Sequence, residues 1–468
     1  MDTNSGSLNA ISPVDGRYRK YTEPLARFLS HAALIRHRAH VEVEYLLALS
    51  AARIGIRRFS AKEVKALRAA AEVSAKGAAI VDAIEWKGYG KVPATHHDLK
   101  AVEYFLKMKL ARTSLKDSLE WIHFALTSED VNNIAYGLML RGALGEVLLP
   151  ALEEIHSALR RLAKENRNVA MLARTHGQPA SPTTFGKEFA VCASRLARQI
   201  DGLRAHHFLV KLNGASGNYN AHVAAFPKVN WVAFTKKFVA GLNKGRKLVL
   251  EPNFLTTQIE PHDTYAELFD NLRRANAVLL DFAQDVWRYI SDGWIGQRAV
   301  KGEVGSSAMP HKVNPIQFEN AEGNLGLANA LCEFFSRKLP ISRLQRDLSD
   351  STAERNFGAA FGHSLVAYRY LLEGLRRVAV HRGAVSGALA AHPEVVAEAI
   401  QTILRREGAA MPYEKLKALT RGREVTLKSI HQFIDSLDIT PKLKKELKKI
   451  TPGNYTGLAE KLARSNHK

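Results

Sequence analysis

One apolar stripe decides the fold class, and it lies in residues 268–289, LFDNLRRANAVLLDFAQDVWRY. Its apolar members follow one another at steps of 4, 3, 4, 3, 4 and 3, at Leu268, Leu272, Ala275, Leu279, Phe282, Val286 and Tyr289. Steps of three and four keep these side chains on one face of an α-helix, so the segment predicts a helix of about six turns. Because such a face must pack on other helices, the chain is predicted to be all-α, with long central helices forming a bundle.

Similar stripes occur elsewhere in the chain. One follows Pro150, and because proline suits the first turn of a helix, we expect a helix to begin there and to bury Leu152, Ile155, Leu159 and Leu162. Others lie in residues 101–110, 364–375 and 395–403. Strand-like patterns are scarce, with short candidates at residues 247–250 and 189–193, and the second reads equally well as helix.

Composition excludes several classes of protein. The 468 residues include 46% hydrophobic and 24% charged residues, which is ordinary for globular domains and excludes disorder and collagen. No window reaches the roughly 18 uninterrupted apolar residues that a membrane span needs. The first residues, MDTNSGS, lack the basic-then-apolar order of a signal peptide. We therefore expect a soluble, cytoplasmic protein without a membrane partner.

The net charge and the two cysteines bear on whether the protein binds nucleic acid or a structural metal. The chain carries 67 Lys and Arg against 46 Asp and Glu, a formal charge of +21. Its densest basic run, residues 442–449, has leucines at helical spacing and none of the aromatic residues on which nucleic-acid bases stack, so it predicts a solvated helix and not a nucleic-acid surface. Cys192 and Cys332 have no second Cys or His at zinc-finger spacing, so we expect neither a disulfide framework nor a structural metal.

Polar breaks between the helices carry the unusual residue clusters. The chain as a whole is expected to form three helical domains: an N-terminal domain (1–120), a central long-helix bundle (121–370) and a C-terminal domain (371–468). Loops held by a rigid scaffold are where catalytic groups tend to lie. The breaks are residues 86–97, 173–186, 213–221, 251–264, 298–315 and 340–356.

The densest cluster is residues 302–315, GEVGSSAMPHKVNP. Its two glycines can take positive φ angles ahead of Ser306, which lets consecutive amides converge on an anion. Lys312 and Asn314 add a cation and an amide donor. The segment lacks the Gly-Lys-Ser/Thr ending of a nucleotide P-loop. It therefore predicts a loop that binds an anionic small molecule.

Two further breaks contain histidines. His176 lies in RTHGQP, residues 174–179, among polar neighbours. A lone histidine is more often structural, but this side chain is also the one best suited to proton transfer near neutral pH. His96 and His97 precede Asp98, which we expect to cap or to begin a helix. Capping accounts for Asp98 but leaves the paired histidines unexplained.

The remaining clusters point to capping and to anion binding. Thr127–Asp130, TSED, opens a helix in the manner of a capping box and is taken alone as structural. Three arginines surround hydroxyl residues in a group typical of a phosphate or carboxylate site: Arg343, Arg346 and Arg355, with Ser349, Ser351 and Thr352. The inventory suits proton transfer on a polyanionic small molecule, without specifying the bond that breaks.

Several of these strings resemble a known superfamily. Residues 305–315, GSSAMPHKVNP, resemble the signature loop of the fumarase, aspartase and argininosuccinate lyase superfamily, whose members eliminate fumarate from a substituted succinate. Five other strings resemble the adenylosuccinate lyase family of the bacterial purine pathway: SPVDGRY (12–18), TSEDVNN (127–133), RTHGQP (174–179), TTQIEPHD (256–263) and SRLQRD (342–347). The likeness runs from Ser12 to beyond Tyr413 and so covers nearly the whole chain.

The resemblance implies two reactions of purine nucleotide biosynthesis. Adenylosuccinate is cleaved to AMP and fumarate, and the succinylcarboxamide ribotide SAICAR is cleaved to AICAR and fumarate. It also implies a homotetramer in which long helices of four subunits form one bundle and each active site is shared between three subunits. No organic cofactor and no metal are implied.

Residue roles implied by the resemblance carry over position by position. Ser306 matches the serine that removes the Cβ proton, and His176 matches the acid that protonates the departing nitrogen. Glu319 matches the carboxylate that orients this histidine, and Lys312 and Asn314 match groups that hold the succinyl carboxylate. Eleven more residues match substrate-binding positions: Arg17, Tyr18, His97, Asp98, Thr127, Ser128, Gln258, Asn320, Arg346, Ser351 and Arg355. The family often has Asn where this chain has His96, which we keep as a binding candidate.

Two alternatives remain at this point. The chain could be another fumarate-releasing lyase, such as an argininosuccinate lyase or a fumarase, but His311 and the TTQIEPHD string favour a purine substrate. It could also be a nucleic-acid-binding relative without activity, although the presence of Ser306, His176, Lys312 and Glu319 argues against this.

Overall fold

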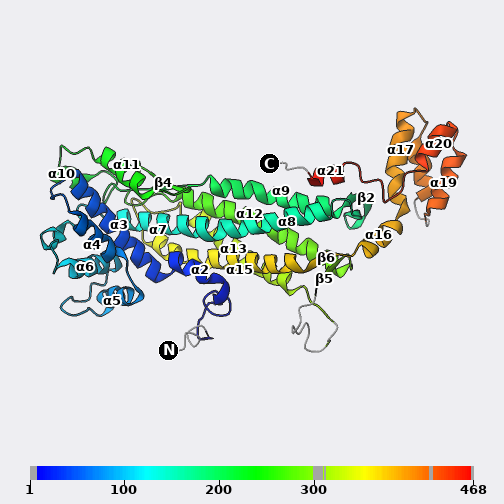
Figure 1. Ribbon diagram of the computed structural model, residues 1–468. Helices are drawn as coiled ribbons and strands as arrows, with labels where there is room; N and C mark the ends of the chain where they lie inside the picture. The colour runs from blue at the N-terminus through cyan, green and yellow to red at the C-terminus, as the bar shows by residue number, and fades with distance from the viewer. Residues whose placement is uncertain (1–7, 299–308, 310–311, 421–424, 465–468) are drawn as a thin grey trace. The chain divides into compact units, whose positions relative to one another are not determined.

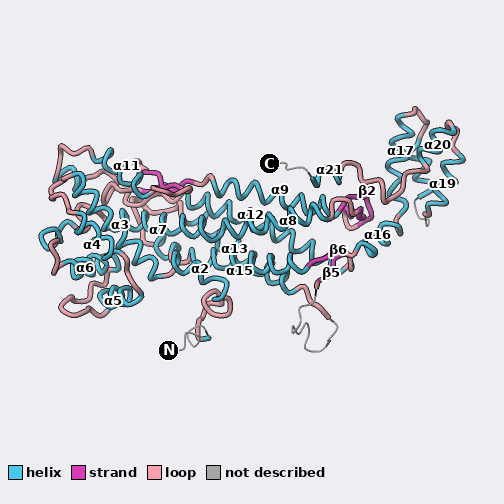
Figure 2. The backbone as a smooth tube through the Cα atoms, viewed as in Figure 1, coloured by secondary structure: helices cyan, strands magenta, loops and turns pink. Residues whose placement is uncertain are grey.

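The computed structural model describes residues 8–298, 309, 312–420 and 425–464. Ser306 and His311, which the sequence places in the signature loop, lie outside the described residues. Figures 1 and 2 show helices throughout the described chain and only short strands. The predicted all-α class with long central helices is confirmed.

The chain divides into two compact units, each made of three segments. Unit 1 comprises residues 1–152, 199–277 and 324–367, and unit 2 comprises residues 153–198, 278–323 and 368–468. Five long helices contain or adjoin the boundaries: α8 (Leu149–Glu165), α9 (Phe185–Arg204), α12 (Asp263–Ser291), α13 (Ile316–Lys338) and α15 (Phe357–Arg377).

The remaining elements belong to one unit each. Those of unit 1 are α2 (Arg19–Leu29), α3 (His31–Ala52), α4 (Ala61–Ala71), α5 (Ala75–Trp86), α6 (Asp98–Leu110), η1 (Lys116–Trp121), α7 (Ser128–Ala143), η2 (Leu144–Leu148), β3 (His207–Val210), α10 (Asn220–Ala225), α11 (Trp231–Leu242), β4 (Val249–Pro252) and α14 (Ser349–Glu354). Those of unit 2 are β1 (Ala170–Thr175), β2 (Gln178–Thr184), β5 (Ile295–Gln297), β6 (Val378–Val380), α16 (Arg382–Ala390), η3 (Pro393–Val396), α17 (Ala397–Arg406), α18 (Pro412–Thr420), α19 (Leu427–Ser436), α20 (Pro441–Leu447) and α21 (Ala459–Arg464).

The stripe that predicted the fold forms α12, a helix of 29 residues. Every stripe residue from Leu268 to Val286 is buried, and Tyr289 is half-buried. Aromatic side chains add to the core of each unit. In unit 1 the ring of Phe269 lies 5.0 Å from that of Phe357, and in unit 2 the ring of Phe185 lies 5.2 Å from that of Tyr289. The apolar periodicity therefore corresponds to a packed interior in both units.

Pro150 lies in the first turn of α8, as predicted, but α8 continues an earlier helix and is not a new start. A continuous helical segment runs from Ser128 to Glu165, and Pro150 lies inside it. Just before the proline, η2 is a π-helical turn, in which the Leu149 N–H donates to the Leu144 carbonyl. Proline has no backbone N–H to donate to the preceding turn. The wider π-helical turn tolerates this missing hydrogen bond, so the helix continues past Pro150. The predicted burial of Leu152, Ile155, Leu159 and Leu162 is confirmed.

Within the described residues the strands form three two-stranded sheets. The candidate at 247–250 overlaps β4, which pairs in parallel with β3, whereas residues 189–193 lie in α9. The antiparallel pair β1–β2 was not predicted as strand and occupies most of the break at 173–186. The small sheets therefore lie between helices and shape the loops where site residues were expected.

One helical segment has the length and the apolar composition of a membrane span. Residues 128–165 are long and apolar enough, but 78% of their most apolar 18-residue window is buried inside the fold. A buried core helix has this composition.

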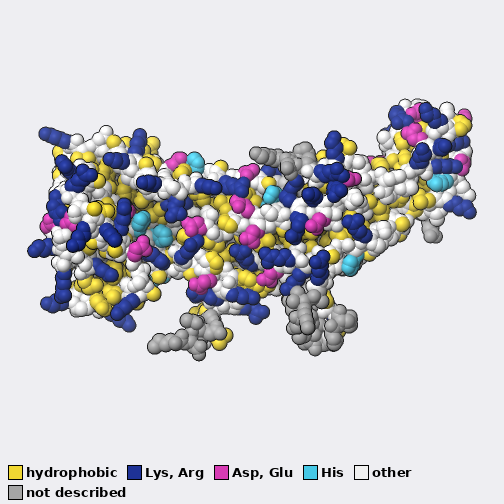
Figure 3. All heavy atoms as spheres, in the orientation of Figure 1, with side chains coloured by type: hydrophobic (Ala, Val, Ile, Leu, Met, Phe, Trp, Pro, Cys, Tyr) yellow, Lys and Arg dark blue, Asp and Glu magenta, His cyan; other side chains and the backbone are white. Residues whose placement is uncertain are grey.

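On the face shown in Figure 3, Lys and Arg side chains are spread among acidic and hydrophobic ones and do not gather in one patch. The basic run at 442–449 falls largely in α20, which buries Leu443 and Leu447 as predicted.

Candidate functional site

The N-terminus of α6 presents three predicted binding residues. His97 caps the helix, since its Nδ1 accepts from the Lys100 N–H at 3.2 Å, and Asp98 is the first helical residue. This tautomer leaves the His97 Nε2–H as a donor, on a side chain that is 52% exposed. His96 takes a positive φ of 49°, which turns the chain into the cap. His97 therefore supplies the cap, and Asp98 begins the helix, which is one of the two positions expected for it.

Asp98 binds two arginines at once. Its Oδ2 lies 2.8 Å from Arg38 Nη2 and 3.1 Å from Arg355 Nη2. Burial raises the pKa of Asp98, but the charge and hydrogen bond of Arg38 outweigh this, and the pKa ends below its ordinary value. Arg355 also donates to Ser351 Oγ at 2.7 Å. The structure therefore brings together three predicted binding residues, Asp98, Ser351 and Arg355.

The capping box at Thr127 is confirmed, and its two acids have different partners. The Asp130 carboxylate accepts from the Thr127 N–H at 2.9 Å and lies 2.9 Å from Lys211 Nζ, with both charged side chains fully buried. Glu129 lies 3.0 Å from Arg346 Nη2. Asp130 is thus structural, whereas Glu129 holds a predicted binding arginine. Thr127 and Ser128 remain half-buried at the start of α7.

Arg346 joins two motifs that are distant in the sequence. Besides Glu129 it contacts Gln258, whose Oε1 accepts from Arg346 Nη1 at 3.4 Å. The Gln258 N–H in turn donates to the Gln345 carbonyl at 3.3 Å, and the side chain of Thr257 donates to the same carbonyl at 2.7 Å. The strings TTQIEPHD and SRLQRD therefore lie side by side.

A buried acid–histidine cluster lies next to Arg346 and was not predicted. His262 is fully buried, with Nε2 3.7 Å from Asp350 Oδ2 and 4.0 Å from Glu354 Oε1. Burial lowers the pKa of His262, but the acids raise it above its ordinary value overall. Burial raises the pKa of Glu354 above its ordinary value. His262 could have been singled out from the sequence, because it belongs to the TTQIEPHD string.

Another buried acid on α3 fixes the chain ahead of α7. Glu42 accepts from the His123 N–H at 3.0 Å and lies 2.6 Å from His123 Nδ1. Burial lowers the pKa of His123, but Glu42, Glu103 and Asp130 raise it above its ordinary value of 6.5. A raised histidine pKa stabilises the fold fully below 6.5, and this contribution is lost as the pH rises through the folded-state value.

We therefore expect His123→Asn to destabilise the protein by about 1.5–3 kcal/mol at about pH 5.5 and by less at about pH 9. Asparagine tolerates the positive φ of 63° at this position but cannot carry the charge. Urea unfolding of both proteins across this range measures the difference. A difference in the free energy of unfolding that stays constant or grows with pH would contradict the assignment.

Arg17 and Tyr18 lie in a separate turn of unit 1. The turn is closed by the hydrogen bond from the Tyr18 N–H to the Pro13 carbonyl at 2.8 Å, and Val14 packs where a Cβ at Gly362 would lie, 2.5 Å away. Arg17 is exposed. The structure thus anchors the turn on α15 and leaves the Arg17 side chain at the surface.

His176 lies at the tip of the β1–β2 hairpin in unit 2. Thr175 pairs with Gln178, so His176 and Gly177 form a two-residue turn, and both have positive φ, 54° and 74°. Positive φ at both positions is the type I′ geometry that joins tightly twisted strands. The hairpin therefore presents the exposed imidazole on a rigid support instead of an irregular loop.

The other catalytic candidates of unit 2 lie at the start of α13. Glu319 is in its first turn, where its Oε1 accepts from Trp287 Nε1 at 3.1 Å, and Asn320 donates to the Ile316 carbonyl at 2.8 Å. Lys312 is exposed ahead of the helix, and Asn314 is half-buried. Among the described residues of this single chain, no contact joins Glu319 to His176, so the predicted orienting role stays a prediction.

Comparison with known proteins identifies the family. Residues 12–329 match the family described as Lyase, and residues 342–456 match the one described as Adenylosuccinate lyase C-terminal. Adenylosuccinate lyase of Vibrio cholerae is 47% identical over 460 residues, which cover 97% of this chain and 98% of that protein. The chain belongs to the adenylosuccinate lyase family. The Escherichia coli K12 adenylosuccinate lyase is 47% identical over 457 residues, and that of Dictyostelium discoideum is 46% identical over 468, each covering 97% of both chains.

Solved structures confirm the fold of this adenylosuccinate lyase family member. Fumarate lyase from Mesorhizobium sp. BNC1 has a TM-score of 0.74 at 19% identity and covers 94% of this chain and 96% of its own. The 3-carboxy-cis,cis-muconate lactonizing enzyme of Pseudomonas putida has a TM-score of 0.70 at 21% identity, covering 95% and 97%. The predicted superfamily is thus confirmed by family, relatives and fold, and the chain is a lyase.

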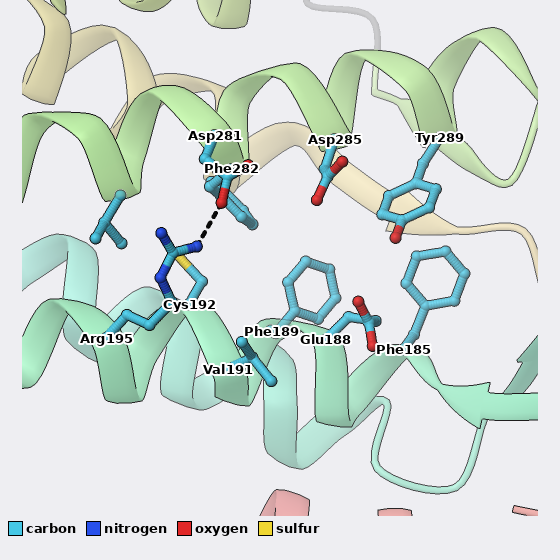
Figure 4. A pocket seen from close by; sticks show the side chains of 11 residues that line it. Phe185, Glu188, Phe189, Val191, Cys192, Arg195, Asp281, Phe282, Asp285 and Tyr289 are labelled. Carbon is cyan, nitrogen blue, oxygen red and sulfur yellow. Dashed lines mark hydrogen bonds and ion pairs between the residues drawn. The ribbon is translucent and has the colours of Figure 1, made fainter. Parts of the chain in front are cut away.

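A pocket in unit 2 lies between α9 and α12, and acidic and aromatic side chains make up most of its lining. Figure 4 shows Glu188, Asp281 and Asp285 around it, with Arg195 paired to Asp281. Burial raises the pKa of Glu188 and of Asp285. None of the residues predicted for the site lines this pocket.

Proposed function

We propose that the protein eliminates fumarate from two purine ribotides, adenylosuccinate to give AMP and SAICAR to give AICAR, in purine nucleotide biosynthesis. The observation that carries this proposal is the match to adenylosuccinate lyases at 47% identity over 97% of the chain. The C-terminal family match adds support, because it is particular to adenylosuccinate lyase and does not apply to lyases in general.

In the proposed reaction, Ser306 removes a proton from Cβ of the succinyl group and His176 gives one to the departing nitrogen. The electrons of the broken C–H bond form the double bond of fumarate as the C–N bond breaks, and the nitrogen leaves as a neutral amine. Negative charge builds up on the carboxylate next to Cβ before the C–N bond breaks. Lys312 and Asn314 are the cation and the amide donor proposed to stabilise that charge.

The anionic groups of the substrate are proposed to bind mainly in unit 1. Arg346 and Arg355 lie beside Gln258 and Ser351, and Arg355 is 46% exposed although it is held by Asp98. Planar guanidinium groups bind carboxylate and phosphate through paired hydrogen bonds. The other proposed binding residues are Arg17, Tyr18, His96, His97, Thr127, Ser128, Asn314 and Asn320.

We propose a homotetramer with each active site shared between three subunits. In this arrangement Glu319 would orient the His176 of another chain, which accounts for their lack of contact within one chain. Large hydrophobic side chains on the long helices support such an assembly, since they remain more than two-fifths exposed: Val191, Trp287, Leu327 and Phe334. Exposed apolar side chains of this size are compatible with a protein interface.

Further parts of the proposal concern organisation and requirements. The protein is proposed to be cytoplasmic, to act on purine ribotides without an organic cofactor or metal, and to have domain boundaries near residues 120 and 370. The described residues contain no group of three or more His, Cys, Asp or Glu that could hold a metal ion. This observation is compatible with acid–base chemistry carried by side chains alone.

Turnover of the purified protein on each ribotide, with fumarate quantified, tests the proposed function. We expect one fumarate for each ribotide cleaved and a change in the purine spectrum with adenylosuccinate. Malate and argininosuccinate serve as control substrates. Fumarate from either control substrate but from neither ribotide would contradict the proposal.

A further inference from the structure

An unbroken line of polar contacts joins Arg355 to Arg346 through the interior of unit 1. Its five contacts are Arg355 Nη2 to Asp98 Oδ2 (3.1 Å), Asp98 Oδ2 to Arg38 Nη2 (2.8 Å), Arg38 Nε to Asn132 Oδ1 (2.9 Å), Asn132 Nδ2 to Glu129 Oε1 (2.7 Å) and Glu129 Oε1 to Arg346 Nη2 (3.0 Å). We call these six residues the Arg38 network. It links two arginines that lie on either side of the short helix α14 (Ser349–Glu354).

Arg38 lies at the centre of the network and belongs to none of the sequence motifs. It is on α3, and its side chain is only 2% exposed. Burying a charge is costly unless it is paired and hydrogen-bonded. Here one edge of the guanidinium binds the Asp98 carboxylate and the Nε–H binds Asn132. A lysine could not make both contacts, because it presents a point charge and not a planar fork.

Each arm of Arg38 ends at a partly exposed arginine. On one side Asp98 shares a single oxygen between Arg38 and Arg355, so the position of Arg355 depends on where Arg38 holds the carboxylate. On the other side Asn132 contacts Glu129, so the position of Glu129 depends on where Arg38 holds Asn132. Glu129 is 2% exposed and in turn binds Arg346. The network contains three guanidinium groups and two carboxylates, and a third carboxylate, Asp350, lies 4.0 Å from Arg346 Nη2.

We propose that Arg38 is a positioning residue that fixes Arg355 and Arg346 relative to each other for binding of the anionic groups of the ribotide. Arg38 does not touch the substrate and acts through Asp98 and through Asn132 and Glu129. This inference rests on the proposed function in one respect, namely that Arg355 and Arg346 bind substrate.

Steady-state kinetics of Arg38→Met and Arg38→Lys test the proposal. We expect Arg38→Met to raise KM at least about tenfold with kcat within about threefold of wild type, because binding is lost but the chemical groups stay in place. Arg38→Lys should raise KM less, since it keeps a positive charge next to Asp98. The matched control is Arg141→Met, which removes another buried arginine of unit 1, one bound to the Leu242 carbonyl. It should leave KM unchanged even where it lowers stability.

A double-mutant cycle separates positioning from a purely structural role. If Arg38 acts through Asp98 on Arg355, Arg38→Met should lower kcat/KM by a smaller factor in the Arg355→Ala background than in wild type. Equal factors in both backgrounds would overturn the inference. Should Arg38→Met fail to fold, Arg38→Lys carries the same cycle in the Arg355→Ala background. Asn132→Ala, which removes the contacts to Arg38 and to Glu129, carries the equivalent cycle in the Arg346→Ala background.

The outcome also distinguishes this inference from the proposed function. If Arg355→Ala and Arg346→Ala leave KM unchanged, the proposed binding roles are wrong whatever Arg38 does. If both raise KM and Arg38→Met does not, the positioning role of Arg38 alone is wrong.

Discussion

Replacing Ser306 by alanine abolishes turnover while adenylosuccinate still binds, if Ser306 is the base. Proton removal from carbon beside a carboxylate needs a positioned acceptor, and a serine hydroxyl acts as one only when cationic, dehydrated surroundings favour its alkoxide. Without the hydroxyl the proposed base is missing, so we expect a fall in kcat of more than about 10⁴-fold. Binding should change little, because the arginines proposed to bind the substrate remain in place.

Ser307→Ala is the matched control, since it removes the neighbouring hydroxyl from the same loop. Stopped assays with high enzyme concentration measure the residual rate, and equilibrium dialysis with labelled adenylosuccinate measures binding. Turnover of Ser306→Ala within about tenfold of wild type would exclude Ser306 as the base.

The second large effect concerns the acid. We expect His176→Ala to lower kcat by about 10²–10⁴-fold, because a poor nitrogen leaving group must then depart without a proton. The hairpin should remain folded, since the backbone pairing of β1 and β2 does not use the imidazole. The limb of the kcat–pH profile that reports the acid should also disappear.

Surface histidines offer a control for this variant. His31 is 57% exposed at the start of α3 and belongs to no candidate site, so His31→Ala should keep both rate and pH profile. A His176→Ala enzyme with the wild-type profile would remove His176 from the acid role.

Apolar periodicity was sufficient to predict the long helices but not their ends. The stripe from Leu268 to Tyr289 predicted α12 because burial on one helical face leaves a repeating signal. Pro150 was correctly placed in the first turn of a helix, but the continuity of α8 with α7 was missed because the π-helical turn at 144–148 has no signature in the local sequence. The β1–β2 hairpin was missed because its turn is His-Gly, where the common signal is Asn-Gly or Asp-Gly.

The site was predicted where motifs expose polar residues and missed where charges are buried. Asp98, Arg346 and Arg355 were recognised, and the structure brings them into one network. Arg38 was not, because α3 also carries Arg36 and several histidines and glutamates, and nothing in the local sequence marks which of these charges has partners at positions 98 and 132. Such pairings depend on tertiary contacts between residues 60 and 94 positions apart.

Mixing two inactive variants tests the central claim most directly. The account holds that one elimination needs Ser306 as base and His176 as acid, in sites shared between subunits. Co-expression of differently tagged Ser306→Ala and His176→Ala chains, followed by purification through both tags, yields mixed oligomers. Their turnover of adenylosuccinate should exceed that of either parent by at least about tenfold, because some sites then contain both intact residues. Mixed oligomers as inactive as their parents would contradict the account.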